Sequence, residues 1–168
     1  MNSLSTVDFD RIGAEFLAQT PELRLQILKK LGLARYAPFL TQLIPSPANL
    51  ACVVTFLKMP DRVKFPPLRG ADLAGLHLEG VNFIRADLTG ANLQNCHLEK
   101  ADMLFARLMD ADLRGANLYD ATLNETIWTG ALVEQCVFGK GKGLTVAQRR
   151  DLTAKGAIFS PVEGEVLL

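Results

Sequence analysis

The chain contains 168 residues, 18 of them basic and 18 acidic, which is enough for one elongated domain and a small attached domain. The net charges of +3 over residues 1–65, −4 over 66–140 and +1 over 141–168 are too small for a nucleic-acid-binding arm. The N-terminus lacks the basic and apolar regions of a secretory signal, and no stretch approaches 18 uninterrupted apolar residues. We therefore expect a soluble cytoplasmic protein that binds neither nucleic acid nor membrane.

Residues 1–65 have the apolar spacing of short α-helices. A first helix is expected after an N-cap at Ser5 or Thr6, and a second is expected from Thr20-Pro21 to Gly32. The apolar face of the first consists of Phe9, Ile12, Phe16 and Leu17, and that of the second of Leu23, Ile27, Leu28 and Leu31.

Two further helices are expected before residue 65. One is short and includes Phe39, Leu40 and Leu43. The other begins at Ser46-Pro47 and ends at Met59-Pro60, and its apolar positions are Leu50, Val53, Val54 and Leu57. Helices this short need a packing partner. Two interpretations stay open for the segment 1–65, namely a cap for the domain that follows and a separate recognition module.

Residues 66–140 repeat with a period of five. One register is large and apolar: Leu68, Leu73, Leu78, Phe83, Leu88, Leu93, Leu98, Met103, Leu108, Leu113, Leu118, Leu123, Trp128, Val133 and Phe138. Two positions earlier stands a mostly small register: Ala71, Leu76, Val81, Ala86, Ala91, Cys96, Ala101, Ala106, Ala111, Ala116, Ala121, Thr126, Ala131 and Cys136. A short polar residue usually separates them, and the fifth position is often glycine. The unit is A-[D/N]-L-x-x.

This period fits neither regular element. A helix would spread the apolar stripe around its circumference, and a flat strand would place successive leucines on opposite faces. The chain must therefore turn every five residues, so that four units close a square coil of 20 residues with both apolar registers inside. Coils stacked at the strand spacing of ~4.8 Å pair their backbones and build one continuous apolar core.

The repeat segment resembles the pentapeptide-repeat family. Units such as Ala71-Asp72-Leu73, Ala91-Asn92-Leu93 and Ala111-Asp112-Leu113 match its motif directly. The resemblance implies an all-β solenoid, a right-handed quadrilateral β-helix of about four coils over residues 66–140. An α-helical segment would precede it at 1–65 and a capping helix with a tail would follow at 141–168. Because this fold serves many functions, the role has to be argued from surface residues.

An apolar strip is expected on one outer wall. Ile84 and Leu104 stand 20 residues apart and Phe105 follows Leu104, so these three side chains should lie together. Their polar neighbours would be Arg85, Asp102 and Glu125. We interpret Ile84, Leu104 and Phe105 either as a candidate partner-binding patch or as a surface that the N-terminal helices cover.

Two polar columns and the cysteines are expected to be structural. His77 and His97 fall one coil apart, but Glu79 and Glu99 stand two positions further along, so we expect stacked turn residues and no metal or cofactor. A second column is expected to accept hydrogen bonds at turns, and it consists of Asp72, Asn92 and Asp112. Three cysteines are too few for a disulfide framework, and we expect reduced thiols at Cys52, Cys96 and Cys136.

The last coil departs from the pattern, with apolar residues at three normally polar positions: Ile127, Leu132 and Val137. We expect the segment after Gly143 to cover them. Thr145 and Gln148 form a capping box, and residues 146–155 have the pattern of a helix that ends at Gly156. The tripeptide Ala157-Ile158-Phe159 resembles one more side of a coil.

No catalytic pattern appears in the sequence, and an interior filled with leucine and alanine leaves no pocket. We therefore do not expect this protein to be an enzyme. The leading interpretation is a non-enzymatic protein–protein interaction module, monomeric or weakly dimeric, that displays a binding surface on a rigid scaffold. The alternative is a DNA-mimicking, topoisomerase-binding member of the family, which would need a longer rod and a dominant acidic field. Because short, helix-fused members are common in cyanobacteria, the resemblance also suggests a bacterial regulatory or assembly role.

Overall fold

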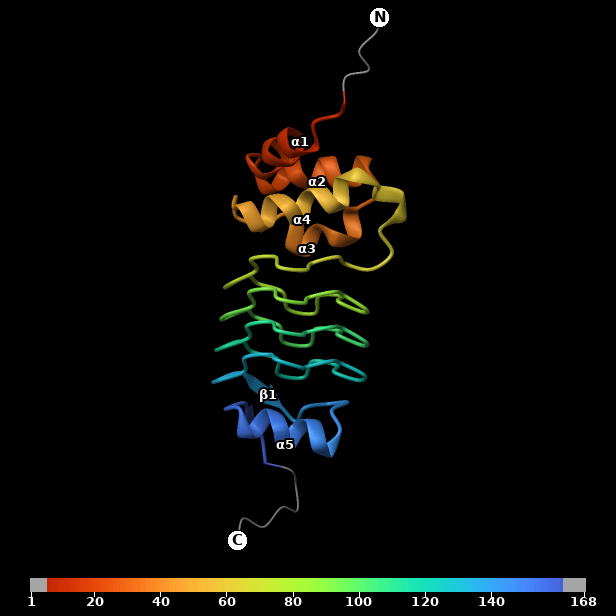
Figure 1. Cartoon of the computed structure of the whole chain (residues 1–168). Helices are drawn as coiled ribbons and strands as arrows, with labels where there is room; N and C mark the ends of the chain where they lie inside the picture. The colour runs from red at the N-terminus through yellow and green to blue at the C-terminus, as the bar shows by residue number, and fades with distance from the viewer. Residues whose placement is uncertain (1–5, 162–168) are drawn as a thin grey trace, which may run out of the picture. The chain divides into compact units, whose positions relative to one another are not determined.

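The computed structural model describes residues 6–161, which fall into two compact units divided between Val63 and Lys64. The first unit is helical and is drawn from red to yellow in Figure 1. The second consists of stacked turns that end in a short sheet and a helix. No helix among the described residues is long and apolar enough to cross a membrane.

The helices of the first unit begin at recognisable capping residues. They are α1 (Phe9–Leu17), α2 (Pro21–Lys30), α3 (Ala37–Leu40) and α4 (Pro47–Lys58), with 3-10 turns η1 (Ala34–Tyr36) and η2 (Pro60–Arg62). Thr20 and Ser46 each accept a hydrogen bond from the backbone N–H three residues later, as predicted. The predicted cap of α1 was wrong. Asp8 takes this role because its carboxylate accepts from the N–H of Arg11, whereas Thr6 lies too early and Ser5 lies outside the described residues.

A buried arginine joins the helix ends of the first unit. Arg24 is 5% exposed, and its guanidinium donates to the carbonyl oxygens of Leu17, Gln19, Leu40 and Leu43. Leu17 and Leu40 are the last residues of α1 and α3, so the cation supplies donors to carbonyl groups that have no partner within their helices. The position is also favourable electrostatically, because the C-terminus of a helix carries partial negative charge.

In the second unit, residues 20 positions apart are paired. Eleven isolated parallel bridges join such residues within the described part of the chain, from Pro67–Asp87 to Asn117–Val137. Around each bridge the backbone bonds in both directions, as when the N–H of Leu73 donates to Asn92 and the N–H of Asn92 donates to Ala71. The chain therefore advances by one layer every 20 residues, as the repeat predicted. These layers are the stacked loops drawn from yellow-green to blue in Figure 1.

Regular strands are much rarer than an all-β solenoid suggests. Among the described residues they are β1 (Val137–Gly139) and β2 (Ile158–Phe159), which pair in parallel. Elsewhere each five-residue side contributes a single bridging residue, because two of its five residues form a turn. The layers are thus held by single-residue bridges between turns.

Left-handed backbone recurs at every corner. Each fifth residue from 70 to 135 has a φ between 55° and 72°. Glycine fills six of these positions, and the other eight are Arg85, Asn95, Lys100, Phe105, Asp110, Asp120, Glu125 and Gln135. Since this region costs a residue with a Cβ roughly 1–2 kcal/mol, the coil imposes the corner geometry even where the local sequence does not favour it.

The interior agrees with the two predicted registers. All fifteen residues of the large register are buried, and the most exposed of them, Trp128, is 5% exposed. The small register is buried as well, apart from Leu76, which is half-buried. Trp128 keeps its polar atom satisfied because the indole N–H donates to Thr126 Oγ1 at 2.7 Å.

The C-terminal segment provides hydrogen-bond partners for the last layer. α5 (Val146–Ala154) begins with the predicted capping box of Thr145 and Gln148, and Figure 1 shows it at the end of the stack. The N–H of Leu123 donates to Lys142 and that of Gln135 donates to Gly156. Open backbone groups of the final layer are thereby paired, which protects an edge that would otherwise associate.

One prediction for this segment was wrong. Ile127 is 39% exposed and Leu132 is 43% exposed, so α5 does not cover them, and Val137 is half-buried. The reason is geometric. These side chains point outward from the walls, whereas α5 lies across the end of the stack and buries Leu152.

Candidate protein-binding surface

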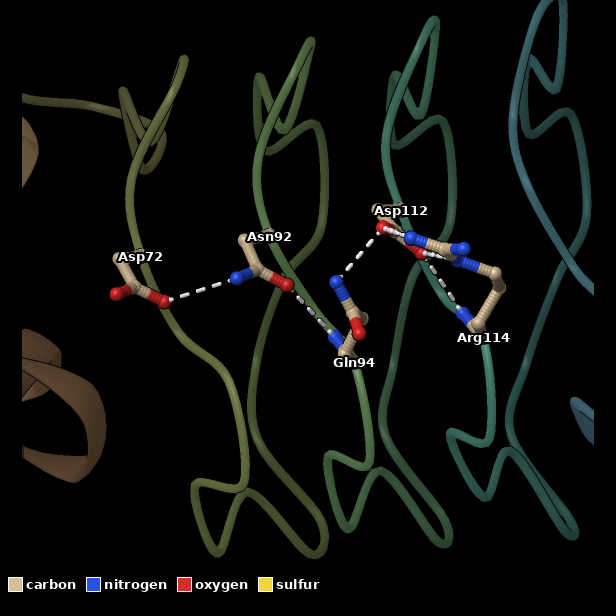
Figure 2. Close-up of polar contacts among 5 residues, drawn as sticks. All are labelled: Asp72, Asn92, Gln94, Asp112 and Arg114. Carbon is tan, nitrogen blue, oxygen red and sulfur yellow. Dashed lines mark hydrogen bonds and ion pairs between the residues drawn. The ribbon is translucent and has the colours of Figure 1, made fainter.

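The polar side chains of one column form hydrogen bonds with one another and with the nearby backbone, as Figure 2 shows. Oδ1 of Asp72, Asn92 and Asp112 each accepts a hydrogen bond from the backbone N–H two residues later, at 3.1–3.3 Å. The same column bonds between layers, since Asn92 Nδ2 donates to Asp72 Oδ1 at 3.2 Å. The Asp or Asn of the repeat is therefore a turn-forming residue, as predicted.

An ion pair lies at the C-terminal end of this column, beside Asp112. Arg114 donates to both carboxylate oxygens of Asp112, at 2.9 and 2.7 Å, and Gln94 Nε2 donates to the same carboxylate at 2.8 Å. The hydrogen bonds from Arg114, together with its charge, hold the pKa of Asp112 below its usual value. These groups are engaged with one another, which leaves this column less available to a partner.

The predicted strip occupies equivalent positions on neighbouring layers. Ile84 and Leu104 are half-buried, and each backbone N–H is held by the preceding Asn82 or Asp102 side chain. The N–H of Arg85 donates to the carbonyl of Leu104 at 2.8 Å, which joins the two layers at this point. Phe105 is 43% exposed at the adjoining corner. These three residues form the apolar strip.

Beside the apolar strip, two aromatic rings enclose a cation. The guanidinium carbon of Arg85 lies 5.4 Å from the ring centre of Phe65 and 5.0 Å from that of Phe105. Phe65, Arg85 and Phe105 stand 20 residues apart and form one column, in which Arg85 and Phe105 are corner residues. Contacts of this kind are worth about 0.5–1 kcal/mol each at exposed sites. We call this arrangement the Phe65–Arg85–Phe105 column.

Phe65 did not appear among the residues predicted from the sequence. It precedes Pro66-Pro67 and carries no repeat motif, so the five-residue pattern gives no signal for it. The signal that would have found it is the period of 20, because Phe65 stands one coil before Arg85. It is 46% exposed, close to the value for Phe105.

The two histidines lie closer to carboxylates than the sequence suggested. His77 and His97 pair across neighbouring layers, and their rings stack at 4.7 Å between centres. Glu79 approaches His77 and Glu99 approaches His97, at 3.5 and 3.6 Å from the Nδ1 atoms. A carboxylate two positions further along the chain therefore reaches back to the imidazole, since the turn folds it over the column.

All three cysteines are buried, and none of them is part of a disulfide. Burial raises the pKa of Cys52 to about 12 and that of Cys96 to about 11, and it raises the pKa of Cys136 as well. None of these thiols is an available nucleophile or metal ligand near neutral pH, because the reactive form is the thiolate.

A comparison with known protein families finds a match for the repeat segment. A sequence model of the family described as Pentapeptide repeats (8 copies) matches residues 68–103 and 92–130. No curated protein matches the chain.

Several solved structures are similar to parts of the chain. A pentapeptide repeat protein from the Arabidopsis thaliana thylakoid lumen is 27% identical over 54% of this chain and 78% of its own, with a TM-score of 0.46. One from Nostoc PCC 7120 is 28% identical over 64% of this chain and 95% of its own, with a TM-score of 0.30. QnrB1, a plasmid-mediated fluoroquinolone resistance protein, is 13% identical over 55% of this chain and 54% of its own, with a TM-score of 0.38.

Proposed function

Because residues 68–130 belong to the pentapeptide-repeat family, we propose that the second unit is a non-enzymatic scaffold that binds a protein partner. The binding surface consists of the apolar strip and the Phe65–Arg85–Phe105 column. In this proposal the stacked layers form the right-handed quadrilateral β-helix that the family resemblance implies, and this rod holds the surface residues at fixed spacings.

The observation that supports this surface best is the conformation of Phe105. Its φ is 59°, a region that is unusual for a bulky residue, and Phe105 is the one aromatic residue among the fourteen described corners from 70 to 135, six of which are glycine. Holding a side chain there costs on the order of 1–3 kcal/mol. A large aromatic residue that is strained and also 43% exposed contributes less to stability than its size would allow. Its value to the protein is better explained by a contact with a partner.

The chemistry of the partner follows from Arg85. The aromatic rings hold its guanidinium in place, and no carboxylate among the described residues forms an ion pair with it. Arginine presents a planar fork of donors that suits a carboxylate. We therefore propose a partner segment that places an acidic side chain on Arg85 and an apolar side chain on the apolar strip. DNA mimicry is less favoured, since it would require an acidic face at this position.

Affinity capture from the native host tests the proposal. The full chain, a Phe105→Ala variant and a Tyr119→Ala control are compared, and Tyr119 is a similarly exposed aromatic residue, at 47%, outside the proposed surface. Alanine keeps the left-handed corner, so Phe105→Ala removes the side chain without relieving the backbone. A partner of this surface should lose about 1–3 kcal/mol of binding free energy with Phe105→Ala and little with Tyr119→Ala.

Melting curves of the variants separate binding from folding. If all partners survive the combined change of Leu104 and Phe105 to alanine, in a protein of unaltered stability, the proposed surface is wrong. If the change instead unfolds the second unit, the two residues serve the fold.

A further inference from the structure

One cluster of side chains outside the proposed binding surface has the composition of a metal site. Within the described residues, His77, Glu79 and His97 bring one ligand atom each to within 4.8 Å of one another. All three side chains are exposed, so a dissolved ion can reach them. Two imidazole nitrogens and a carboxylate oxygen form a ligand set that is typical of zinc.

The backbone holds these ligands together. His77 and His97 are partners in a parallel bridge, and the N–H of His97 donates to Leu76 at 3.0 Å while the N–H of Leu78 donates to His97 at 2.8 Å. The two rings are nearly parallel, at 12° between planes and 4.7 Å between centres. Neither histidine can therefore move away from the other without breaking the pairing of two layers.

Each histidine has a carboxylate beside its Nδ1 atom. Glu79 Oε1 lies 3.5 Å from His77 Nδ1, and Glu99 Oε1 lies 3.6 Å from His97 Nδ1.

Glu99 adds a second, independent observation. Asn117 Nδ2 donates to Glu99 Oε1 at 2.7 Å, whereas the other oxygen, Oε2, is buried and has no hydrogen-bond partner among the described residues. A buried carboxylate oxygen without a partner is costly. A cation beside His97 would reduce this cost.

We propose that His77, His97 and Glu79 bind one zinc ion or a similar divalent transition-metal ion on the wall of the second unit, with Glu99 or water as the fourth ligand. Tetrahedral zinc places its ligand atoms about 3.3 Å apart, from bond lengths of about 2.0–2.2 Å. Rotations of the exposed side chains are enough to reach this separation from the present spacing. The site crosses two layers, so a bound ion would link them.

Few other side chains of this sequence could compete with the cluster for a zinc ion. The chain contains two histidines, and both belong to the cluster. The three cysteines are buried, and burial raises the pKa of each thiol. A metal that binds through imidazole has no alternative location in this sequence.

Calorimetric titration of the full chain with Zn²⁺, after removal of any histidine tag, tests the proposal. We expect one ion per chain and a change in the ring signals of both histidines by nuclear magnetic resonance. Mg²⁺ should not compete, because it prefers oxygen ligands in octahedral geometry. His97→Ala should weaken zinc binding at least about tenfold, since loss of even a supporting partner outside the ligand shell typically costs 10–100-fold.

A matched pair of glutamate variants tests the carboxylate. Glu79→Gln should weaken zinc binding, while Glu125→Gln, at an exposed corner of the same unit, should leave it unchanged. All these positions are exposed, and melting curves confirm that each variant is folded. The proposal is overturned if the full chain takes up no zinc, or if His97→Ala and Glu79→Gln bind it as the unaltered chain does.

Discussion

Replacing Leu108 by alanine tests whether the inward leucines of successive layers form one core. Leu108 is fully buried, and it stands one coil after Leu88 and one coil before Trp128. The spacing of these layers is fixed by backbone bonds, such as that from Leu108 N–H to Ile127 at 2.8 Å and that from Leu88 N–H to Arg107 at 2.9 Å. The neighbouring layers therefore cannot close over the space that the missing atoms leave.

The expected loss follows from this rigidity. Leucine-to-alanine changes in well-packed cores cost about 2.7–5 kcal/mol, and the cost is highest where the surroundings do not relax. We expect about 3–5 kcal/mol here. For a unit of roughly 100 residues, each kcal/mol lowers the melting temperature by about 4 °C, so the midpoint should fall by about 12–20 °C.

Fluorescence of Trp128 measures this change directly. It is the single tryptophan of the chain and lies in the same column, so its signal reports on the second unit. Leu132→Ala is the control, because Leu132 is 43% exposed and its truncation should cost far less. If Leu108→Ala costs under about 1 kcal/mol, or as little as Leu132→Ala, the stacked-core argument fails.

Three further predictions concern the corners, the polar column and the C-terminal end. Gly90→Ala should lower the free energy of unfolding by about 1 kcal/mol in urea titrations, because its φ is +66° and nothing lies within 4 Å of the added Cβ; a change near zero would contradict a strained corner. Asp112→Asn should flatten the acid dependence of stability. Since Arg114 depresses the pKa of Asp112, the unaltered carboxylate stabilises the fold above its unfolded pKa of about 4 and loses this effect as the pH falls through its lower folded pKa; identical pH profiles would contradict this. A chain truncated after Gly143 should self-associate in light-scattering measurements, because it loses Gly156 and Leu152 from the end of the stack; a truncated chain that stays monomeric would show that the end needs no cover.

The sequence predicted best where a residue's role is repeated or strictly local. Leu108 could be assigned to the core because the same register recurs every five residues, and the capping box at Thr145 and Gln148 depends only on residues three apart. The predicted cap of α1 was wrong because Thr6 and Asp8 both carry a side-chain oxygen that can accept from the first turn, and the start of the helix decides between them.

The surfaces were harder to predict because they depend on turns that a linear pattern does not resolve. The strip of Ile84 and Leu104 follows from the 20-residue period, yet the place of Phe65 beside Arg85 needs the first coil to begin one residue before Pro66. Glu79 seemed too far along the chain to join the histidine column. The turn that follows His77 changes the direction of the backbone, and this brings the Glu79 carboxylate back toward the imidazole.

The pairing of residues 20 positions apart makes the length of this unit discrete. An insertion of one residue would shift every later side chain by one position, so that inward leucines would face solvent and corner residues would enter the core. An insertion of 20 residues would preserve each column and add one layer. The unit can therefore lengthen or shorten only in steps of a whole coil of 20 residues.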